Sequence, residues 1–342
     1  MQRSSFTTLR NLVTALLASL YLASSAFGQG SLELIQVEGA SLAGNLEGDA
    51  TLRDVYVYLP PGYADAPAKR YPVVYFLHGY GATAQRYVEG VLDLPAGANR
   101  AIEAGAAEAI VVVPDAYTLY GGSMYSNSLA TGDWEGFIAN DLVAYIDSHY
   151  RTLATRESRG LSGHSMGGYG ALRIGMKYPQ TFGALYAMSS CCLMNQAPSQ
   201  QTVQQQEARM AEGPITAERG FTNVAQAQAV AWAANPHNPP YYFDWPWRDG
   251  EPQPLVQARW AANSPLVFVD QYVPALKHYR AIMLDVGDQD SLAASNRQLD
   301  AELTRLGVEH GFEVYEGDHG NRIGERFQAL LLPYFSRNLD AQ

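Results

Sequence analysis

Apolar residues gather in short runs along the chain, and segments with helical spacing separate these runs. Runs typical of buried or half-buried strands cover residues 31–38, 51–59, 71–77, 109–115, 182–189, 281–284 and 312–317. Apolar residues with helical spacing occur in residues 100–106, 134–146 and 171–178. Because strands alternate with helices, the pattern predicts an α/β fold with a mainly parallel central sheet and helices on both of its faces.

This alternation stops between about residues 193 and 273. A glutamine-rich stretch at 200–206 is followed there by an aromatic-rich stretch at 238–247. Because the segment lies between two predicted core strands, we expect a cap-like insertion over the carboxyl ends of the strands, where ligands bind in open α/β sheets. No linker-like tract demands a second domain, so residues 29–342 are predicted to form one domain.

The N-terminal residues have the pattern of a secretory signal peptide. Arg3 and Arg10 accompany an apolar run at residues 12–22, and small residues follow as far as Gly28. We therefore predict that residues 1–28 are removed and that the protein is exported to the periplasm or the medium. The run is too short for a comfortable transmembrane helix, so no membrane span is expected in the mature chain.

Composition argues against several classes of ligand. The formal net charge of -11 disfavours binding to nucleic acid and to anionic membranes. No group of His, Cys, Asp and Glu has metal-ligand spacing, so no metal or cofactor is expected. The only two cysteines, Cys191 and Cys192, are adjacent, which excludes a conventional disulfide and predicts two small buried thiols.

A candidate nucleophile lies in the stretch Gly163-x-Ser165-x-Gly167. This G-x-S-x-G pattern fits the nucleophile elbow, a strained strand-to-helix turn that raises a serine hydroxyl above a sheet. The predicted helix at 171–178 and strand at 182–189 supply the order of elements that the elbow requires. The sequence therefore predicts Ser165 as the nucleophile of a hydrolase-type site.

A serine nucleophile needs a base, and the base needs an acid that holds its tautomer. Where such an elbow is used, the chain order is serine, acid, histidine. Of the seven histidines, that order disfavours those that precede or adjoin the serine, lie in the expected cap or precede the candidate acid, namely His78, His149, His164, His237 and His278. His310 leads into the last strand, whereas His319 follows it on a loop, so His319 is the predicted base.

The acid and the oxyanion donors follow from the same layout. Asp288 and Asp290 both lie on the loop after the strand at 281–284, and their spacing does not separate them. One oxyanion donor is expected from the backbone N–H of Met166, at a helix N-terminus. The second is expected from the backbone N–H of Tyr80, in the glycine-rich loop that follows residues 71–77.

Several further sequence motifs add to this pattern. They are Tyr71-Pro72-Val73-Val74-Tyr75-Phe76-Leu77-His78-Gly79, Tyr125-Ser126-Asn127-Ser128, Asp133-Trp134-Glu135, Tyr150-Arg151-Thr152, the elbow with its flanks, and Gly287-x-x-Asp290 before His319. With them, the chain from about residue 50 onward resembles the esterase D family of α/β-hydrolases, which includes S-formylglutathione hydrolases, feruloyl esterases and mycolyltransferases. The resemblance implies an α/β-hydrolase fold and, through its G-x-x-D loop, favours Asp290 over Asp288 as the acid.

The expected activity is that of an exported serine esterase that acts through an acyl-enzyme, with a small-molecule or carbohydrate-linked ester as substrate. A feruloyl or acetyl ester of plant cell-wall carbohydrate is one expectation. Substrate contacts are expected from the 120–135 loop and the aromatic segment, at Tyr125, Asn127, Trp134, Tyr241 and Trp245. The alternatives are acyl transfer of the mycolyltransferase type, an S-formylglutathione hydrolase-like thioesterase, and a binding module that has lost catalysis.

Overall fold

The computed structural model describes residues 28–194, 198–211 and 224–341. The predicted signal peptide at 1–28 therefore lies almost wholly outside the described residues. Among the described residues, no helix is long and apolar enough to cross a membrane.

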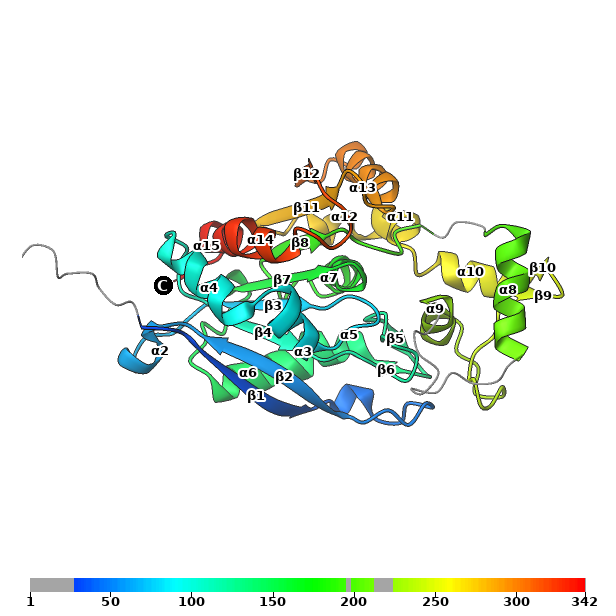
Figure 1. Cartoon of the computed structure of the whole chain (residues 1–342), viewed down its shortest axis with the longest axis horizontal. Coiled ribbons are helices and arrows are strands. Elements are labelled where there is room, and N and C mark those ends of the chain that lie inside the picture. The colour runs from blue at the N-terminus through cyan, green and yellow to red at the C-terminus, as the bar shows by residue number, and fades with distance from the viewer. Residues whose placement is uncertain (1–27, 195–197, 212–223, 342) are drawn as a thin grey trace, which may run out of the picture.

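A large sheet runs through the centre of the molecule (Figure 1). In the described chain it has eight strands in the order β1-β2-β4-β3-β7-β8-β11-β12. The strands are β1 (Ser31–Glu38), β2 (Leu52–Leu59), β3 (Val73–Leu77), β4 (Ile110–Pro114), β7 (Arg159–His164), β8 (Ala184–Met188), β11 (Ala281–Gly287) and β12 (Gly311–Tyr315). β2 pairs antiparallel with β1 and β4, and neighbouring strands from β4 to β12 pair in parallel, which confirms the predicted mainly parallel sheet.

Helices cover both faces of this sheet (Figure 1). Those of the main body are α2 (Gly62–Asp65), α3 (Ala84–Arg86), α4 (Leu94–Glu103), α5 (Trp134–Gly136), α6 (Val143–His149), α7 (Met166–Lys177), α13 (Ala293–Arg305), α14 (Ile323–Arg326) and α15 (Leu332–Asn338). Short π-helical segments join α5 to α6 and α14 to α15. The predicted helices are present. α4 begins at Leu94, earlier than its apolar spacing indicated, and α7 begins at Met166, where the elbow predicted a helix N-terminus.

Side chains on the strands alternate between two hydrophobic cores. On β3, Val73 and Tyr75 enter one core, which α6 and α7 cover, whereas Val74 and Phe76 enter the other, which α4 and α15 cover. Because side chains of a strand point alternately to opposite faces, a continuous apolar run is what a strand buried on both sides requires. This double burial fixes the register of the strands and hence the positions of the loops at their carboxyl ends.

The chain leaves the sheet between β8 and β11. This connection contains α8 (Gln200–Ala211), α9 (Val224–Trp232), the hairpin of β9 (Trp247–Arg248) and β10 (Glu251–Pro252), α10 (Pro254–Ala261), α11 (Pro265–Phe268) and α12 (Val273–Leu276). In Figure 1, α8, α10 and the hairpin lie at one end of the molecule, beyond the small ladder of β5 (Asn127–Ser128) and β6 (Gly132–Asp133). α11 and α12 instead contact α7, so the last part of the segment returns to the main body.

The cysteines differ from the prediction. Cys191 and Cys192 are joined in a disulfide between neighbouring residues, and both are half-buried rather than buried thiols. They lie shortly after the carboxyl end of β8, and the N–H of Cys191 donates to the carbonyl of Ser165. The prediction of free thiols was wrong because adjacency excludes only a conventional disulfide, not a small ring between two neighbouring residues.

Candidate active site

The backbone turns sharply at Ser165, between the end of β7 and the start of α7. Ser165 has φ 58° and ψ -113°, a conformation that non-glycine residues rarely adopt. A Cβ at Gly163 would lie 2.7 Å from the Leu77 carbonyl oxygen, and one at Gly167 would overlap that carbonyl. The two glycines are therefore required because strand and helix pass too closely for any side chain.

Three side chains from distant parts of the sequence form one hydrogen-bond chain. The Ser165 hydroxyl donates to Nε2 of His319 at 2.9 Å, and Nδ1 of His319 donates to Oδ2 of Asp290 at 2.8 Å. His319 lies on the loop after β12 and Asp290 on the loop after β11. The Asp290 side chain is fully buried, whereas 43% of the His319 side chain is exposed. The buried carboxylate thus holds Nδ1 of a ring that stays partly exposed.

The other nearby acids have different partners. Asp288 accepts from the backbone N–H of Gly317 at 3.0 Å and so supports the loop that carries His319. Asp285 is buried at the end of β11, where it accepts from Tyr186 and Arg326, and burial raises the pKa of its carboxyl group. Only Asp290, of these three, bonds to the His319 ring in the described chain.

His164, which chain order excluded as a base, holds the His319 loop in place. Its Nε2 lies 2.8 Å from the backbone carbonyl of His319, and its Nδ1 lies 2.7 Å from the Tyr87 hydroxyl. Burial, with a contribution from His319, lowers the pKa of His164 to about 3, so its ring is neutral near pH 7. Because a carbonyl only accepts, Nε2 carries the proton and Tyr87 donates to Nδ1. Its place beside the serine was visible in the sequence, but its partners were not.

The expected oxyanion donors lie beside the serine. Met166 is the first residue of α7, and N–H groups in the first turn of a helix have no intrahelical partner. The loop after β3, which contains Tyr80, also approaches the nucleophile, since a Cβ at Gly79 would lie 3.4 Å from the Cβ of Ser165. Both expected donor segments therefore lie next to Ser165.

A buried histidine fixes the loop that contains Tyr80. The N–H of Ala116 donates to Nε2 of His78 at 2.8 Å, so Nδ1 carries the proton and donates to the Gly79 carbonyl at 2.9 Å. Burial lowers the pKa of His78, which keeps the ring neutral. The loop is thus tied to the end of β4 before any ligand arrives.

Two residues that were expected to contact substrate lie in the core instead. The Tyr125 side chain is 0% exposed and donates to the His78 carbonyl, and Trp134 is 1% exposed and donates to the Thr131 carbonyl. Neither ring can reach a bound ligand, so the expected substrate contacts are corrected to core packing for both. The motifs that contain Tyr125 and Trp134 suggested a role near the site, but a motif does not report how deeply a side chain is buried. Asn127, the third member of this group, is exposed on β5.

The two expected aromatic residues of the insertion are half-buried. The Tyr241 hydroxyl donates to the Met210 carbonyl at 2.7 Å, which ties the 238–247 segment to α8. Trp245 packs among aromatic rings, with centroids 6.0 Å from Trp247 and 6.1 Å from Trp260. These contacts stabilise the insertion, and they place Trp245 on the wall of a pocket described below. Among the described residues, no cluster of three or more His, Cys, Asp or Glu could hold a metal ion.

Comparison with known proteins identifies the family of the chain. The family model described as Esterase matches residues 50–337. The chain belongs to the Esterase family. Esterase Rv1288 of Mycobacterium tuberculosis strain H37Rv is 26% identical over 282 residues, which cover 78% of this chain and 52% of that protein. The S-formylglutathione hydrolase of Paracoccus denitrificans is 29% identical over 150 residues, with 39% of this chain and 50% of that protein covered. The chain thus spans about half the length of the curated relatives that it matches.

Solved structures show the same fold. A ferulic acid esterase superposes with a TM-score of 0.67 at 22% identity and covers 91% of this chain and 98% of its own. The S-formylglutathione hydrolase of Staphylococcus aureus superposes with a TM-score of 0.58 at 14% identity, with 92% and 100% covered. These neighbours confirm the α/β-hydrolase fold, and together with the family model they confirm the resemblance to the esterase D group.

Proposed function

We propose that this member of the Esterase family is a serine carboxylic-ester hydrolase that works through an acyl-enzyme. The observation that carries the proposal is the hydrogen-bond chain from Ser165 through His319 to Asp290, at a turn that raises the serine above the helix N-terminus. In the proposed roles, Ser165 is the nucleophile, His319 the general base and acid, and Asp290 the residue that orients His319.

Acylation begins when the Ser165 oxygen attacks the ester carbonyl carbon. The hydroxyl proton passes to Nε2 of His319, which already accepts from that hydroxyl. Asp290 accepts from Nδ1 and stabilises the imidazolium that forms. The negative charge on the tetrahedral intermediate faces the N–H groups of Met166 and Tyr80, and His319 then protonates the leaving alcohol.

Deacylation repeats these steps with water. His319, again neutral, removes a proton from a water molecule that attacks the acyl carbon, and the proton returns to the Ser165 oxygen as the acid product leaves. Because 43% of the His319 side chain is exposed, water has access to the base, which supports hydrolysis over transfer of the acyl group to another hydroxyl.

We further propose a feruloyl or acetyl ester of a carbohydrate as the substrate class. A ferulic acid esterase is among the structural neighbours, and an endo-1,4-beta-xylanase/feruloyl esterase of Xylanibacter ruminicola is 29% identical over 143 residues, which cover 40% of this chain and 19% of that protein. The proposed domain comprises residues 29–342, with the cap-like insertion at about 193–273 beside the site.

Export is the third part of the proposal. The basic start, the short apolar run and the small residues before Gln29 support cleavage after Gly28. When the full chain is produced in a bacterium, the exported form should have Gln29 as its first residue by N-terminal peptide mass. A protein that keeps residues 1–28 and stays in the cytoplasm would contradict this part alone.

The activity is tested by hydrolysis of p-nitrophenyl acetate and methyl ferulate, with wild type beside Ser165→Ala. We expect turnover of at least one ester by the wild type and its loss in the variant. The ratio of the two rates reports whether the acyl pocket accepts an aromatic group. Absence of turnover from folded wild-type protein would refute the esterase proposal and favour a binding module.

A further inference from the structure

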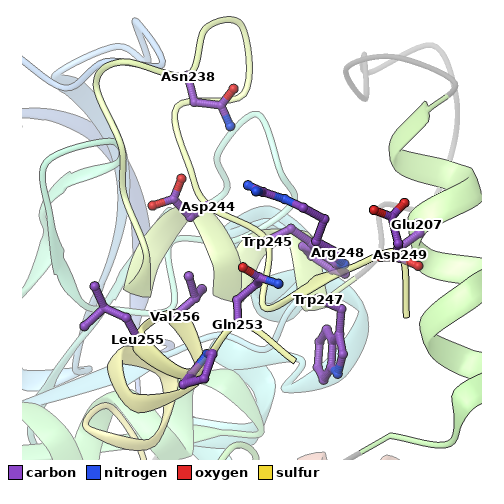
Figure 2. A pocket seen from close by; sticks show the side chains of 11 residues that line it. Glu207, Asn238, Asp244, Trp245, Trp247, Arg248, Asp249, Gln253, Leu255 and Val256 are labelled. Atoms are coloured by element: carbon purple, nitrogen blue, oxygen red, sulfur yellow. The ribbon is translucent and has the colours of Figure 1, made fainter. Parts of the chain in front are cut away.

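A pocket lies in the insertion, apart from Ser165. Its walls come from the hairpin of β9 and β10, the loop before the hairpin, the start of α10, and Glu207 on α8. Its volume is about 600 Å³, within the range of roughly 300–1,000 Å³ that is typical of ligand sites. Figure 2 shows side chains from these different elements around the same space, with Glu207 and Asp249 near α8 and Asp244 on the opposite wall. The hydrogen-bond chain of Ser165 uses none of its residues.

The walls of this pocket are held by bonds within the protein. Glu207 on α8 accepts from the N–H of Gly250 at 3.1 Å, which fixes the hairpin turn against the helix. Asp244 accepts from Asn235 at 2.7 Å and pairs with Arg259 at 3.4 Å. These groups are occupied, so the pocket keeps its shape without a ligand.

Aromatic rings form the inner wall. Trp247 is half-buried and lies edge-on to Trp260, with centroids 6.2 Å apart and an interplanar angle of 82°. Trp245 contacts both of these rings, and Trp245 and Trp247 line the pocket. Edge-to-face contacts leave ring faces free for a further partner.

The remaining polar groups are free to bind a ligand. Within the described chain, the exposed side chains of Arg248 and Asp249 make no hydrogen bond or ion pair, and both line the pocket. Gln253 donates through its amide nitrogen to the Glu251 carbonyl, which leaves its amide oxygen as an acceptor. The pocket thus offers a strong donor, two acceptors and an aromatic wall.

This mixture selects a ligand class by exclusion. An anion would face the carboxylates of Glu207, Asp244 and Asp249. For a cation, the Glu207 and Asp244 carboxylates are already bonded within the protein, and the remaining carboxylate, Asp249, is next to Arg248 in the chain. A purely apolar ligand would strip water from Arg248 and Asp249 without replacing its hydrogen bonds. A neutral ligand with many hydroxyl groups and an apolar ring face satisfies all of these groups.

We propose that this pocket is a binding site for a neutral oligosaccharide, separate from the ester-cleaving site. The sugar ring would lie against Trp247, and its hydroxyl groups would bond to Arg248, Asp249 and Gln253. The further step, that the bound glycan is the one that carries the ester, rests on the proposed esterase function.

α9 connects the two sites. In the middle of this helix, Gln228 donates to Sγ of Cys192, next to Cys191, whose N–H bonds to the Ser165 carbonyl. At its C-terminal end, the Trp232 indole donates to Ser126 in the main body and its ring lies 5.8 Å from Trp260, which contacts the pocket rings. Through Trp260, the wall of the pocket thus contacts α9, which also bonds to the chain next to the serine turn.

The test uses Ser165→Ala protein, in which ester bonds on a glycan would stay intact, and isothermal titration calorimetry. The probes are xylohexaose and cellohexaose as neutral glycans, an oligogalacturonate as an anion and a glucosamine oligomer as a cation. We expect one of the two neutral glycans to bind with a sub-millimolar Kd, and Trp247→Ala and Arg248→Ala each to weaken it by about tenfold or more. Arg297→Ala, which removes an exposed arginine on α13, is the matched control and should leave the Kd unchanged.

Because Trp247 contacts two other tryptophans, its variant could lose structure, and thermal unfolding of each variant checks this. Arg248 is exposed, so Arg248→Ala should keep the fold, and its effect on the Kd tests the proposal even if Trp247→Ala unfolds. Absence of neutral-glycan binding, preference for a charged probe, or binding that both pocket variants leave intact would overturn the proposal.

The two proposals fail separately. Turnover of p-nitrophenyl acetate by wild type measures the esterase, and calorimetry on Ser165→Ala measures the pocket. Turnover without glycan binding would refute the pocket, whereas glycan binding by a wild type without turnover would refute the esterase.

Discussion

The sheet that carries Ser165 and the insertion between β8 and β11 position their side chains by different means. Around Ser165, each group is held in one position. At Gly167 the backbone passes too close to its neighbour for a Cβ, and at His164 a buried hydrogen bond fixes the ring. In the insertion, the half-buried rings of Trp245 and Trp247 each lie edge-to-face with Trp260, and exposed polar groups such as Arg248 face solvent.

The difference follows from what each region must do. Bond-making chemistry tolerates displacements of only a fraction of an ångström, so its groups need rigid support. A binding surface tolerates variation, because ring contacts and solvated polar groups adapt to a ligand. Substitutions in the core should therefore act steeply on turnover, and those in the insertion should act on affinity for large substrates.

The largest effect is expected for the groups that exchange the proton. Ser165→Ala and His319→Ala should each lower kcat for p-nitrophenyl acetate by about 10⁵-fold or more, because the members of a triad act as a unit. The double variant should lose little more than either single one. Steady-state kinetics on folded protein measure kcat for each variant. If the losses in activation free energy of the two single variants add up in the double variant, the two side chains act independently.

The next effect separates the two acids. Asp290→Asn should lower kcat by about 10³–10⁴-fold, because an amide favours the wrong tautomer of His319. Asp288→Asn is the matched control, since an amide oxygen can still accept from the Gly317 N–H, and a loss below about tenfold is expected. The reverse ranking in kcat would transfer the role to Asp288.

The sequence predicted the core of the fold and the side chains of Ser165, His319 and Asp290 because the patterns that indicate them are local. Continuous apolar runs marked the strands, and the G-x-S-x-G turn marked Ser165. Apolar spacing marked α7 only from residue 171, because glycines occupy its first turns, whereas the elbow motif placed its start at Met166. Gly167, Gly168 and Gly170 are needed for close approach to neighbouring chain segments, which only the folded structure reveals.

Other features depend on contacts between distant residues. A motif does not report depth, so Tyr125 and Trp134 were expected at the substrate and lie in the core. The partners of His164 are Tyr87 and the His319 carbonyl, each far from it in sequence. The pocket around Trp247 combines elements that carry little periodic pattern, and sequence alone offered no reason to place Glu207 opposite Asp244.

A third prediction concerns stability against acid. His164 has a pKa of about 3 in the folded protein against an ordinary value of 6.5, so the unfolded chain binds more protons between these values. The free energy of unfolding should therefore fall as pH decreases from about 6.5 to 3, by on the order of 4–5 kcal/mol from this group. Urea unfolding across this range should show a weaker pH dependence for His164→Gln, which retains an N–H donor and does not titrate. An equal slope in both proteins would place the acid sensitivity elsewhere.

The smallest effect tests the correction at Trp134. Trp134→Phe removes the hydrogen bond to Thr131 and part of a buried ring, which should lower the free energy of unfolding by about 1–2 kcal/mol. The KM for methyl ferulate should change less than twofold if the ring serves only the core. A tenfold rise in KM with unchanged stability would restore the role in substrate binding.

The central claim is that Ser165 is an activated nucleophile, and covalent labelling tests it most directly. Wild type, Ser165→Ala and Asp290→Asn are treated with a fluorophosphonate, and the adduct is mapped by peptide mass. The account predicts one adduct, on Ser165, with no labelling of Ser165→Ala and slower labelling of Asp290→Asn. An unlabelled but folded wild type, or an adduct that persists in Ser165→Ala, would contradict it.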